Sequence, residues 1–328
     1  MRYKILILLF LSLLIINCSN ERIVSVTFMS ASDDVFEVKN LKRGACLESI
    51  PYLIDGGSQT FFSWVDKSGK EYGPASVVMS DVVLYPNYID TDEIIKTPMN
   101  ILFFGDSIGA GVGWILSDSK YPTNFSFPFT KYGDYCKQHF SGGLAFLLSD
   151  RFSQVNIFNL SVGGAHFSTE IDEGPYYYEE LDYLIESYNN MNIDIVCVET
   201  TFNDYDSIKI GKTSVQTVLL DFRGFLRKIK KTFPNAKIMV MNSADGRYQE
   251  IKDDNLSIDL VELLNGFEEQ CELEAVPYFD IRKEANFSSK YGSNWFKDLF
   301  PDGIHINEVG YRKILFPLFL SFLARNIN

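Results

Sequence analysis

Three residues in this chain of 328 have the types and spacing that nucleophilic catalysis requires. Ser107 lies in Gly105-Asp106-Ser107-Ile108-Gly109, where small residues let the backbone turn sharply and leave a serine hydroxyl exposed. A serine hydroxyl is a weak nucleophile and needs a base near neutral pH, a role that suits histidine. His305 can be that base, and Asp302 lies close enough in sequence to orient its ring. Taken alone, each motif also fits an ordinary turn.

Residues that could donate hydrogen bonds come directly after other predicted strands. Acyl transfer passes through an oxyanion, which needs two or three preorganised hydrogen-bond donors. The backbone amides of Ser107 and Gly164 and the side-chain amide of Asn203 can supply them. Gly163 could replace Gly164 as the donor. His166, just beyond, could line the site, although an incidental histidine is the simpler interpretation.

These residues need a scaffold, and from Ile101 onward the sequence alternates between strand and helix patterns. Apolar runs predict five strands, at 101–104, 155–162, 193–200, 236–242 and 276–281. Helical patterns lie between or after them, at 142–152, 176–188, 215–233, 258–273 and 309–326. This order implies right-handed βαβ units and a parallel sheet covered on both faces. Such proteins place their sites at the carboxyl ends of the strands, where the predicted donors stand.

The motifs resemble the SGNH (GDSL) hydrolase family over about residues 100–328. Four of the family's blocks are recognisable in order: Gly105-Asp106-Ser107, Gly164 within Asn159–Ala165, Asn203-Asp204, and Asp302-Gly303-Ile304-His305. The resemblance implies a three-layer α/β/α sandwich with a flavodoxin-like, five-stranded parallel sheet. It also implies a serine ester hydrolase that works through an acyl-enzyme and requires no metal or cofactor.

The family's roles carry over to matching positions. Ser107 would attack, His305 would act as base and then as acid, and Asp302 would orient it. Ser107, Gly164 and Asn203 would form the oxyanion hole. Thr201 departs from the family pattern, which has glycine there; this alters the pocket wall but removes no catalytic group.

Two other enzyme classes fit less well. The G-x-S-x-G pattern around Ser107 also occurs in α/β-hydrolases, but those place several strands before it and their acid well before the histidine. Gly109, Gly111 and Gly113 give GxGxG, which is not the GxGxxG of a Rossmann nucleotide site.

Composition supports a folded, acidic protein. Hydrophobic residues make up 46% and aromatic residues 15% of the chain, ample for a core. Asp and Glu number 43 against 30 Lys and Arg, a net charge of −13. This excess argues against a nucleic-acid partner, because phosphate binding needs concentrated basic charge.

The amino terminus is typical of an export signal. Arg2 and Lys4 precede an apolar run over 5–16, which is followed by Cys18. We expect residues 1–18 to be a lipoprotein-type signal peptide, with Cys18 lipidated and the protein held on a membrane surface of the cell envelope. Asn17 departs from the usual small residue, and an ordinary secretory signal with a secreted product is the alternative.

Four cysteines remain after Cys18, at positions 46, 136, 197 and 271. Export would permit disulfides, and four cysteines allow three full pairings. Cys197 lies in an apolar strand pattern and fits a buried free thiol better. The Cys and His spacings indicate no zinc site, and with three histidines a His-rich metal site is not expected.

Residues 19–97 predict a small β-rich module and linker ahead of a catalytic domain at 98–328. Strand patterns occur at 22–28, 35–38, 60–65 and 77–84, with a hairpin turn at 66–70 and a linker at 86–96. The module could bind glycan or pack on the catalytic domain; we favour packing.

Residues 113–140 form a long, aromatic-rich connection after the serine turn. Its aromatic side chains could stack on sugars, form an acyl pocket or pack on the β module, and the sequence does not separate these roles. Together with the anchor and the module, it favours an O-acetylated carbohydrate as substrate. The alternatives are a lipid acyl ester, an O-acyltransferase using the same triad, and a noncatalytic surface glycan-binding lipoprotein.

Overall fold

The computed structural model of the protein describes residues 22–47, 50–51, 53, 58–73, 76–112, 114, 125–126, 143–171, 175–187, 191–200, 202–249, 257–285 and 295–327. The chain divides into two compact units, Met1–Leu53 with Phe61–Tyr88, and Ile54–Thr60 with Ile89–Asn328. The predicted signal peptide with Cys18, Thr201, and most of the aromatic segment 113–140 lie outside the described residues.

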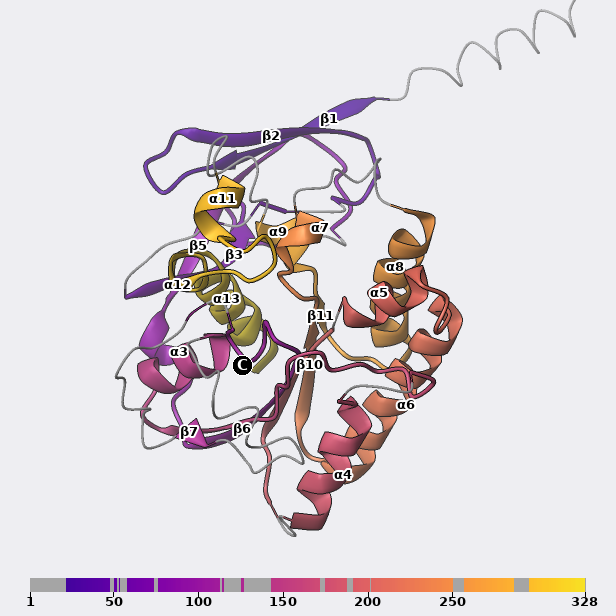
Figure 1. Ribbon diagram of the computed structural model, residues 1–328. Coiled ribbons are helices and arrows are strands. Elements are labelled where there is room, and N and C mark those ends of the chain that lie inside the picture. The colour runs from indigo at the N-terminus through magenta and orange to yellow at the C-terminus, as the bar shows by residue number, and fades with distance from the viewer. Residues whose placement is uncertain are drawn as a thin grey trace, which may run out of the picture. The chain divides into compact units, whose positions relative to one another are not determined.

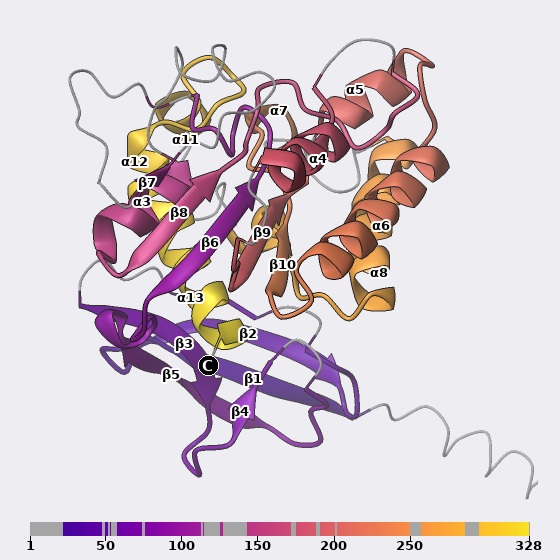
Figure 2. The ribbon, with the colours of Figure 1, turned by 90° about the horizontal axis from the view of Figure 1, so that it is seen from below.

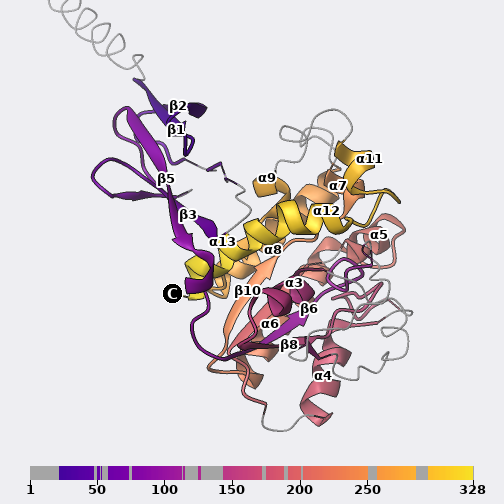
Figure 3. The ribbon, with the colours of Figure 1, turned by 90° about the vertical axis from the view of Figure 1, so that its left-hand side faces the viewer.

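The first unit contains a five-stranded mixed sheet (Figure 3). Its strands are β1 (Ile23–Met29), β2 (Val35–Lys42), β3 (Gln59–Val65), β4 (Glu71–Tyr72) and β5 (Val82–Asp90), in the order β2-β1-β5-β3-β4. Alternate residues of β1 are buried, as a sheet with one covered face requires. Trp64 is fully buried, and its ring meets Phe28 edge-on at 4.9 Å between centroids.

The linker prediction at 86–96 was wrong for its first half. Strand β5 continues through Pro86 to Asp90, and a 3₁₀ turn, η1 (Thr91–Glu93), follows. The described pairing of β5 with β1 ends at Leu84, so Pro86 removes no hydrogen bond from that pairing. Val77 belongs to an isolated bridge with Cys46, not to the strand predicted at 77–84. The hairpin turn at 66–70 is confirmed, since β3 and β4 pair antiparallel across it.

The second unit is built on a parallel sheet with strands β6 (Met99–Phe104), β7 (Phe125–Ser126), β8 (Val155–Asn159), β9 (Ile195–Glu199), β10 (Lys237–Met241) and β11 (Tyr278–Phe279). Their order is β11-β10-β9-β6-β8-β7. Without the short edge strand β7 this is the flavodoxin-like order, so the predicted fold class is confirmed. The two-residue β7 is too short to leave a sequence pattern. The order reverses between β6 and β9, which is where such sheets place their sites.

Helices cover both faces of this sheet (Figures 1 and 2). On one face lie α4 (Tyr177–Ser187), α6 (Val215–Thr232) and α8 (Ile258–Leu273), and on the other lie α3 (Gly143–Arg151) and α13 (Phe316–Ile327). Two of these helices have serine caps that fix where they begin: the side chains of Ser214 and Ser257 accept a backbone N–H of the first turn of α6 and of α8.

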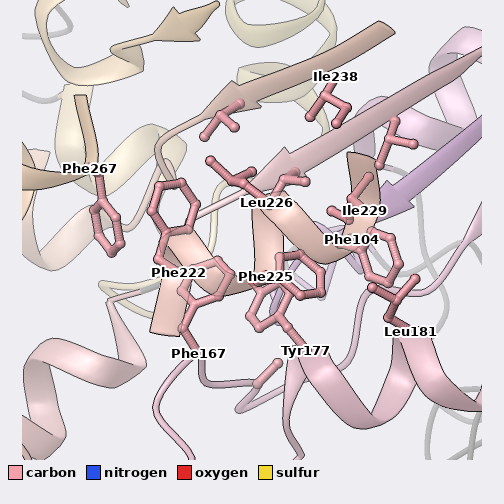
Figure 4. Close-up of a cluster of buried hydrophobic side chains, with 14 of the residues drawn as sticks. Phe104, Phe167, Tyr177, Leu181, Phe222, Phe225, Leu226, Ile229, Ile238 and Phe267 are labelled. Carbon is pink, nitrogen blue, oxygen red and sulfur yellow. The ribbon is translucent and has the colours of Figure 1, made fainter. Parts of the chain in front are cut away.

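A hydrophobic core of buried side chains lies under α4, α6 and α8 (Figure 4). Phe167 stacks on Tyr177 with ring centroids 4.2 Å apart, and it meets Phe222 edge-on at 5.0 Å. Phe104, the last residue of β6, packs edge-on against Phe225 at 5.2 Å. Burial of these rings anchors the end of β6, and with it the start of the serine turn.

Sequence patterns missed several short helices, which are α5 (Asn203–Lys209), α7 (Gly246–Gln249), α9 (Ile281–Ala285) and α11 (Trp295–Leu299). One or two turns give too little apolar periodicity to detect. The helix predicted at 309–326 is divided into α12 (Glu308–Gly310), a π-helical segment η3 (Tyr311–Leu315) and α13. Within the described ranges, no helix has both the length and the apolarity of a membrane span.

The described cysteines are free thiols. Cys197 and Cys271 are buried and Cys46 is exposed, so the expectation of a buried thiol at Cys197 is confirmed. Burial raises the pKa of the Cys197 thiol. Trp114 is 4% exposed and packs edge-on against Phe146, which makes it a packing residue and not a stacking platform.

Candidate active site

The candidate nucleophile stands on a tightly bonded turn after β6. Ala110 N–H donates to Asp106 O at 2.9 Å, and Val112 N–H donates to Ser107 O at 2.9 Å. The Asp106 carboxylate accepts Ile108 N–H at 2.8 Å, which closes a local side-chain turn. The Ser107 side chain is half-buried. The turn therefore holds the hydroxyl in one place at the carboxyl end of a central strand.

The structure brings the three predicted catalytic side chains together. Ser107 Oγ lies 2.9 Å from His305 Nε2, although the two residues are 198 positions apart. His305 Nδ1 lies 2.7 Å from Asp302 Oδ2. With the ring proton on Nδ1, His305 donates to the carboxylate and its Nε2 accepts the serine hydroxyl. This is the tautomer that a general base for a serine needs.

The acid of this triad is held by its own loop. Asp302 Oδ1 accepts the backbone N–H groups of Ile304 at 2.9 Å and His305 at 2.7 Å. Burial raises the pKa of the Asp302 carboxyl, but the hydrogen bonds from His305 and from these amides outweigh it, and the net pKa is lowered. Asp302 is therefore a carboxylate over the whole neutral pH range, able to orient the histidine ring.

The predicted oxyanion donors follow neighbouring strands of the sheet. Asn203 Nδ2 donates to Ala165 O at 3.1 Å and lies 3.4 Å from Asp106 Oδ2. Within the described ranges, the backbone N–H groups of Ser107 and Gly164 donate to no other residue. Gly164 has φ of +78°, a conformation that favours glycine, whereas Gly163 does not. The backbone conformation therefore requires glycine at position 164 but not at position 163.

Comparison with known proteins identifies the family. The model of the GDSL-like lipase/acylhydrolase family matches residues 103–313. The chain belongs to this family. Membership makes it a carboxylic ester hydrolase, and the matched range contains every triad and oxyanion residue described above. No curated protein sequence matches the chain closely enough to count as a relative.

Solved structures similar to this GDSL-family chain share little sequence with it. A protein from Parabacteroides merdae described as a GDSL-like lipase has 18% identity and a TM-score of 0.48, over 70% of this chain and 98% of its own. A mutant acetyl-xylooligosaccharide esterase from Geobacillus has 16% identity and a TM-score of 0.48, over 70% and 95%. A phospholipase A1 from Streptomyces albidoflavus has 14% identity and a TM-score of 0.43, over 69% and 99%.

Asp204 connects two elements of the GDSL-family site. Its carboxyl oxygens accept the N–H groups of Phe167 at 2.9 Å and Ser168 at 3.0 Å. The segment after Gly164 is thereby tied to α5, which begins with Asn203. Burial raises the pKa of Asp204 to about 7, although these two amides act in the opposite direction. The sequence named Asp204 only as part of a motif and gave it no role.

His166 lies beside Asp204, with its Nδ1 3.9 Å from the Asp204 carboxylate. Burial lowers the pKa of His166 to about 4, so the ring is neutral at physiological pH. Within the described part of the chain, no group of three or more His, Cys, Asp or Glu side chains is placed to hold a metal ion.

Sequence reasoning missed two buried residues beneath the serine turn, Glu199 and Tyr311. Tyr311 donates its hydroxyl hydrogen to Ile108 O at 2.6 Å. Glu199 ends the apolar run Ile195–Val198 and is 3% exposed. The position of an acidic residue at the end of a buried strand is the one sequence signal that could have identified Glu199, because acidic side chains are almost never fully buried unless they have a partner.

Proposed function

We propose that this ester hydrolase works through an acyl-enzyme on Ser107. The chain of hydrogen bonds from Ser107 through His305 to Asp302 is the observation that carries the proposal. Ser107 Oγ would attack the ester carbonyl carbon while its proton passes to His305 Nε2. The charged imidazolium would be stabilised by the Asp302 carboxylate.

The tetrahedral intermediate carries a negative oxygen, which the N–H groups of Ser107, Gly164 and the Asn203 amide would bind. As the carbon–oxygen bond to the alcohol breaks, His305 would give its proton to the leaving oxygen. Water would then attack the acyl-enzyme with His305 again as base. The carboxylic acid product would leave, and His305 would return the proton to Ser107 Oγ, which restores the free enzyme.

For the substrate, we propose acetyl or other short acyl groups on a carbohydrate. The net charge of −13 opposes the approach of anionic phospholipids at low salt, whereas a neutral glycan ester meets no such barrier. The aromatic residues at 113–140 and the separate β-rich unit are consistent with a polymeric substrate. A lipid ester and transfer to another acceptor alcohol are the competing outcomes.

We also propose that the protein is exported and held at a membrane surface through lipid on Cys18. The basic start at Arg2 and Lys4, the apolar run over 5–16 and the cysteine that follows support this. Anchoring would keep the enzyme at the cell envelope, close to polymeric carbohydrate.

The test compares hydrolysis of p-nitrophenyl acetate and p-nitrophenyl octanoate by wild type and Ser107→Ala, with Ser153→Ala as control. Ser153 is an exposed serine outside the site. We expect wild type and Ser153→Ala to prefer acetate and Ser107→Ala to be inactive, after which acetylated polysaccharides are the next substrates. Preference for octanoate would favour lipid esters. Equal hydrolysis by wild type and Ser107→Ala would refute the acyl-enzyme on Ser107.

A further inference from the structure

A buried carboxyl group lies directly beneath the turn that carries Ser107. Glu199 is the last residue of β9, and β9 pairs with β6, with Phe104 opposite Val198. The residues that come next are Gly105, which follows the end of β6, and Glu199, the last residue of β9. This register brings the Glu199 side chain to the start of the serine turn.

The contact is close enough to explain two glycines of the turn. A Cβ atom at Gly105 would lie 2.8 Å from Glu199 Oε2, and one at Gly109 would lie 2.6 Å from it. Both distances are shorter than real Cβ contacts. Neither glycine has a positive φ, so close approach and not backbone conformation requires glycine here. Glu199 thus touches both ends of the segment that carries the nucleophile.

The space around this contact is almost completely filled. A cavity of about 10 Å³ lies there, lined in part by Ile108, Gly109, Ser161, Glu199 and Tyr311. This is no more than one water molecule needs. The turn therefore cannot move toward the sheet unless the Glu199 side chain moves too.

We propose that Glu199 is a positioning residue for the nucleophile: its carboxyl group supports the turn at Gly105 and Gly109 and thereby fixes the distance from Ser107 to His305. The inference rests on the proposed role of Ser107. Glu199 itself touches neither the substrate nor the transferred proton.

The supporting group is the uncharged acid. Burial first, and the charge of Asp106 second, raise the pKa of Glu199 well above its usual range, while the nearby Ser243 hydroxyl and Gly109 amide oppose this. Two adjacent buried carboxyls do not both ionise readily. A neutral Glu199 leaves the negative charge on Asp106, which accepts Ile108 N–H and faces Asn203. The side chain at position 199 therefore supports the turn through its shape and its polar surface and not through a charge.

The test compares Glu199→Gln, Glu199→Leu and Glu199→Asp, with Val198→Ala as control. Glutamine keeps the shape without a charge, leucine removes the polar surface, and aspartate withdraws the carboxyl by one methylene. Val198 is fully buried in the core and precedes Glu199 on β9, so its truncation tests the effect of weakening the same strand. Each variant is checked for folding by circular dichroism, and kcat, KM and the rate of Ser107 labelling by a fluorophosphonate are measured.

We expect Glu199→Gln and Val198→Ala to keep kcat within about threefold of wild type, and Glu199→Leu to lose at least tenfold in kcat and in labelling with KM little changed. If leucine prevents folding, Glu199→Asp provides the same comparison with the same expected loss. Unchanged kcat in the folded Leu or Asp variant would overturn the proposal, as would a loss in Gln equal to that in Leu. If wild type itself shows no Ser107-dependent hydrolysis, the proposed function fails instead.

Discussion

Replacing Gly109 by alanine tests how precisely the serine turn must be placed. The backbone at Gly109 has no positive φ, so alanine meets no conformational barrier there. Its Cβ, however, would lie 2.6 Å from Glu199 Oε2, 2.8 Å from Ser161 Oγ and 3.0 Å from Gly105 Cα. The effect of the substitution is therefore steric, and it acts from within the turn.

The size of the displacement gives the expected effect on the rate. Restoring an ordinary contact of 3.4 Å to Glu199 requires a movement of about 0.8 Å. A misplacement of about 1 Å in an active site costs about 10²-fold in rate. We expect kcat to fall by about 10²-fold, which corresponds to about 2.7 kcal/mol of transition-state stabilisation. KM should change little, because the turn positions the nucleophile and not the alcohol part of the ester.

The assay measures kcat and KM for p-nitrophenyl acetate, together with thermal unfolding. Overpacking at Gly109 should also cost about 1–3 kcal/mol of folding free energy. Gly73→Ala is the matched control, since a Cβ there meets no atom within 4 Å and φ is not positive. It should leave both kcat and the melting temperature unchanged.

A folded Gly109→Ala variant that keeps kcat within threefold of wild type would refute this prediction. That result would mean that the turn relaxes without moving Ser107. An equal loss in Gly73→Ala would show that the assay reports general instability.

Three further predictions follow from the site and the amino terminus. Asp302→Asn should lower kcat by about 10³-fold or more, because the amide no longer selects the productive His305 tautomer; an unchanged kcat for p-nitrophenyl acetate would contradict this. Since the pKa of Asp204 is raised to about 7, its contribution to stability is complete below about pH 4 and lost as pH rises through 7. Urea unfolding should therefore show wild type losing stability relative to Asp204→Asn between about pH 4 and 7, and a pH-independent difference would disprove it. Cys18→Ser should move the protein from the membrane fraction to the soluble fraction, and an unchanged distribution would rule out lipid anchoring.

The parts of the site that the sequence predicted are those fixed by local chain order. Ser107 follows an apolar run, and Asp302 and His305 lie within one turn of each other, so their chemistry is visible in short segments. The convergence of Asn203 with Ser107 followed from strand ends alone, because the carboxyl ends of parallel strands meet at one edge. These predictions needed no knowledge of side-chain packing.

What the sequence did not reveal depends on contacts between distant segments. Glu199 and Tyr311 reach the serine turn from another strand and from the carboxyl-terminal helical segment, and no local pattern links them to Ser107. Strand β5 passes through Pro86, although the sequence predicted a linker from that residue onward. Whether a strand tolerates a proline depends on its pairing partners, which the sequence does not show. The π-helical segment at Tyr311–Leu315 likewise interrupts a helix whose apolar pattern is continuous.

The distance along the chain between the triad residues has a consequence for folding. Ser107 and His305 are 198 residues apart, and the Tyr311–Ile108 hydrogen bond spans 203 residues. All described strands of the parallel sheet end by Phe279, so a chain that stops there contains these strands but not the base. Contacts of long sequence separation form late, because loop closure must precede them. Ester hydrolysis therefore requires synthesis of the chain at least through His305, and enzyme activity reports the docking of this carboxyl-terminal segment in addition to the formation of the sheet.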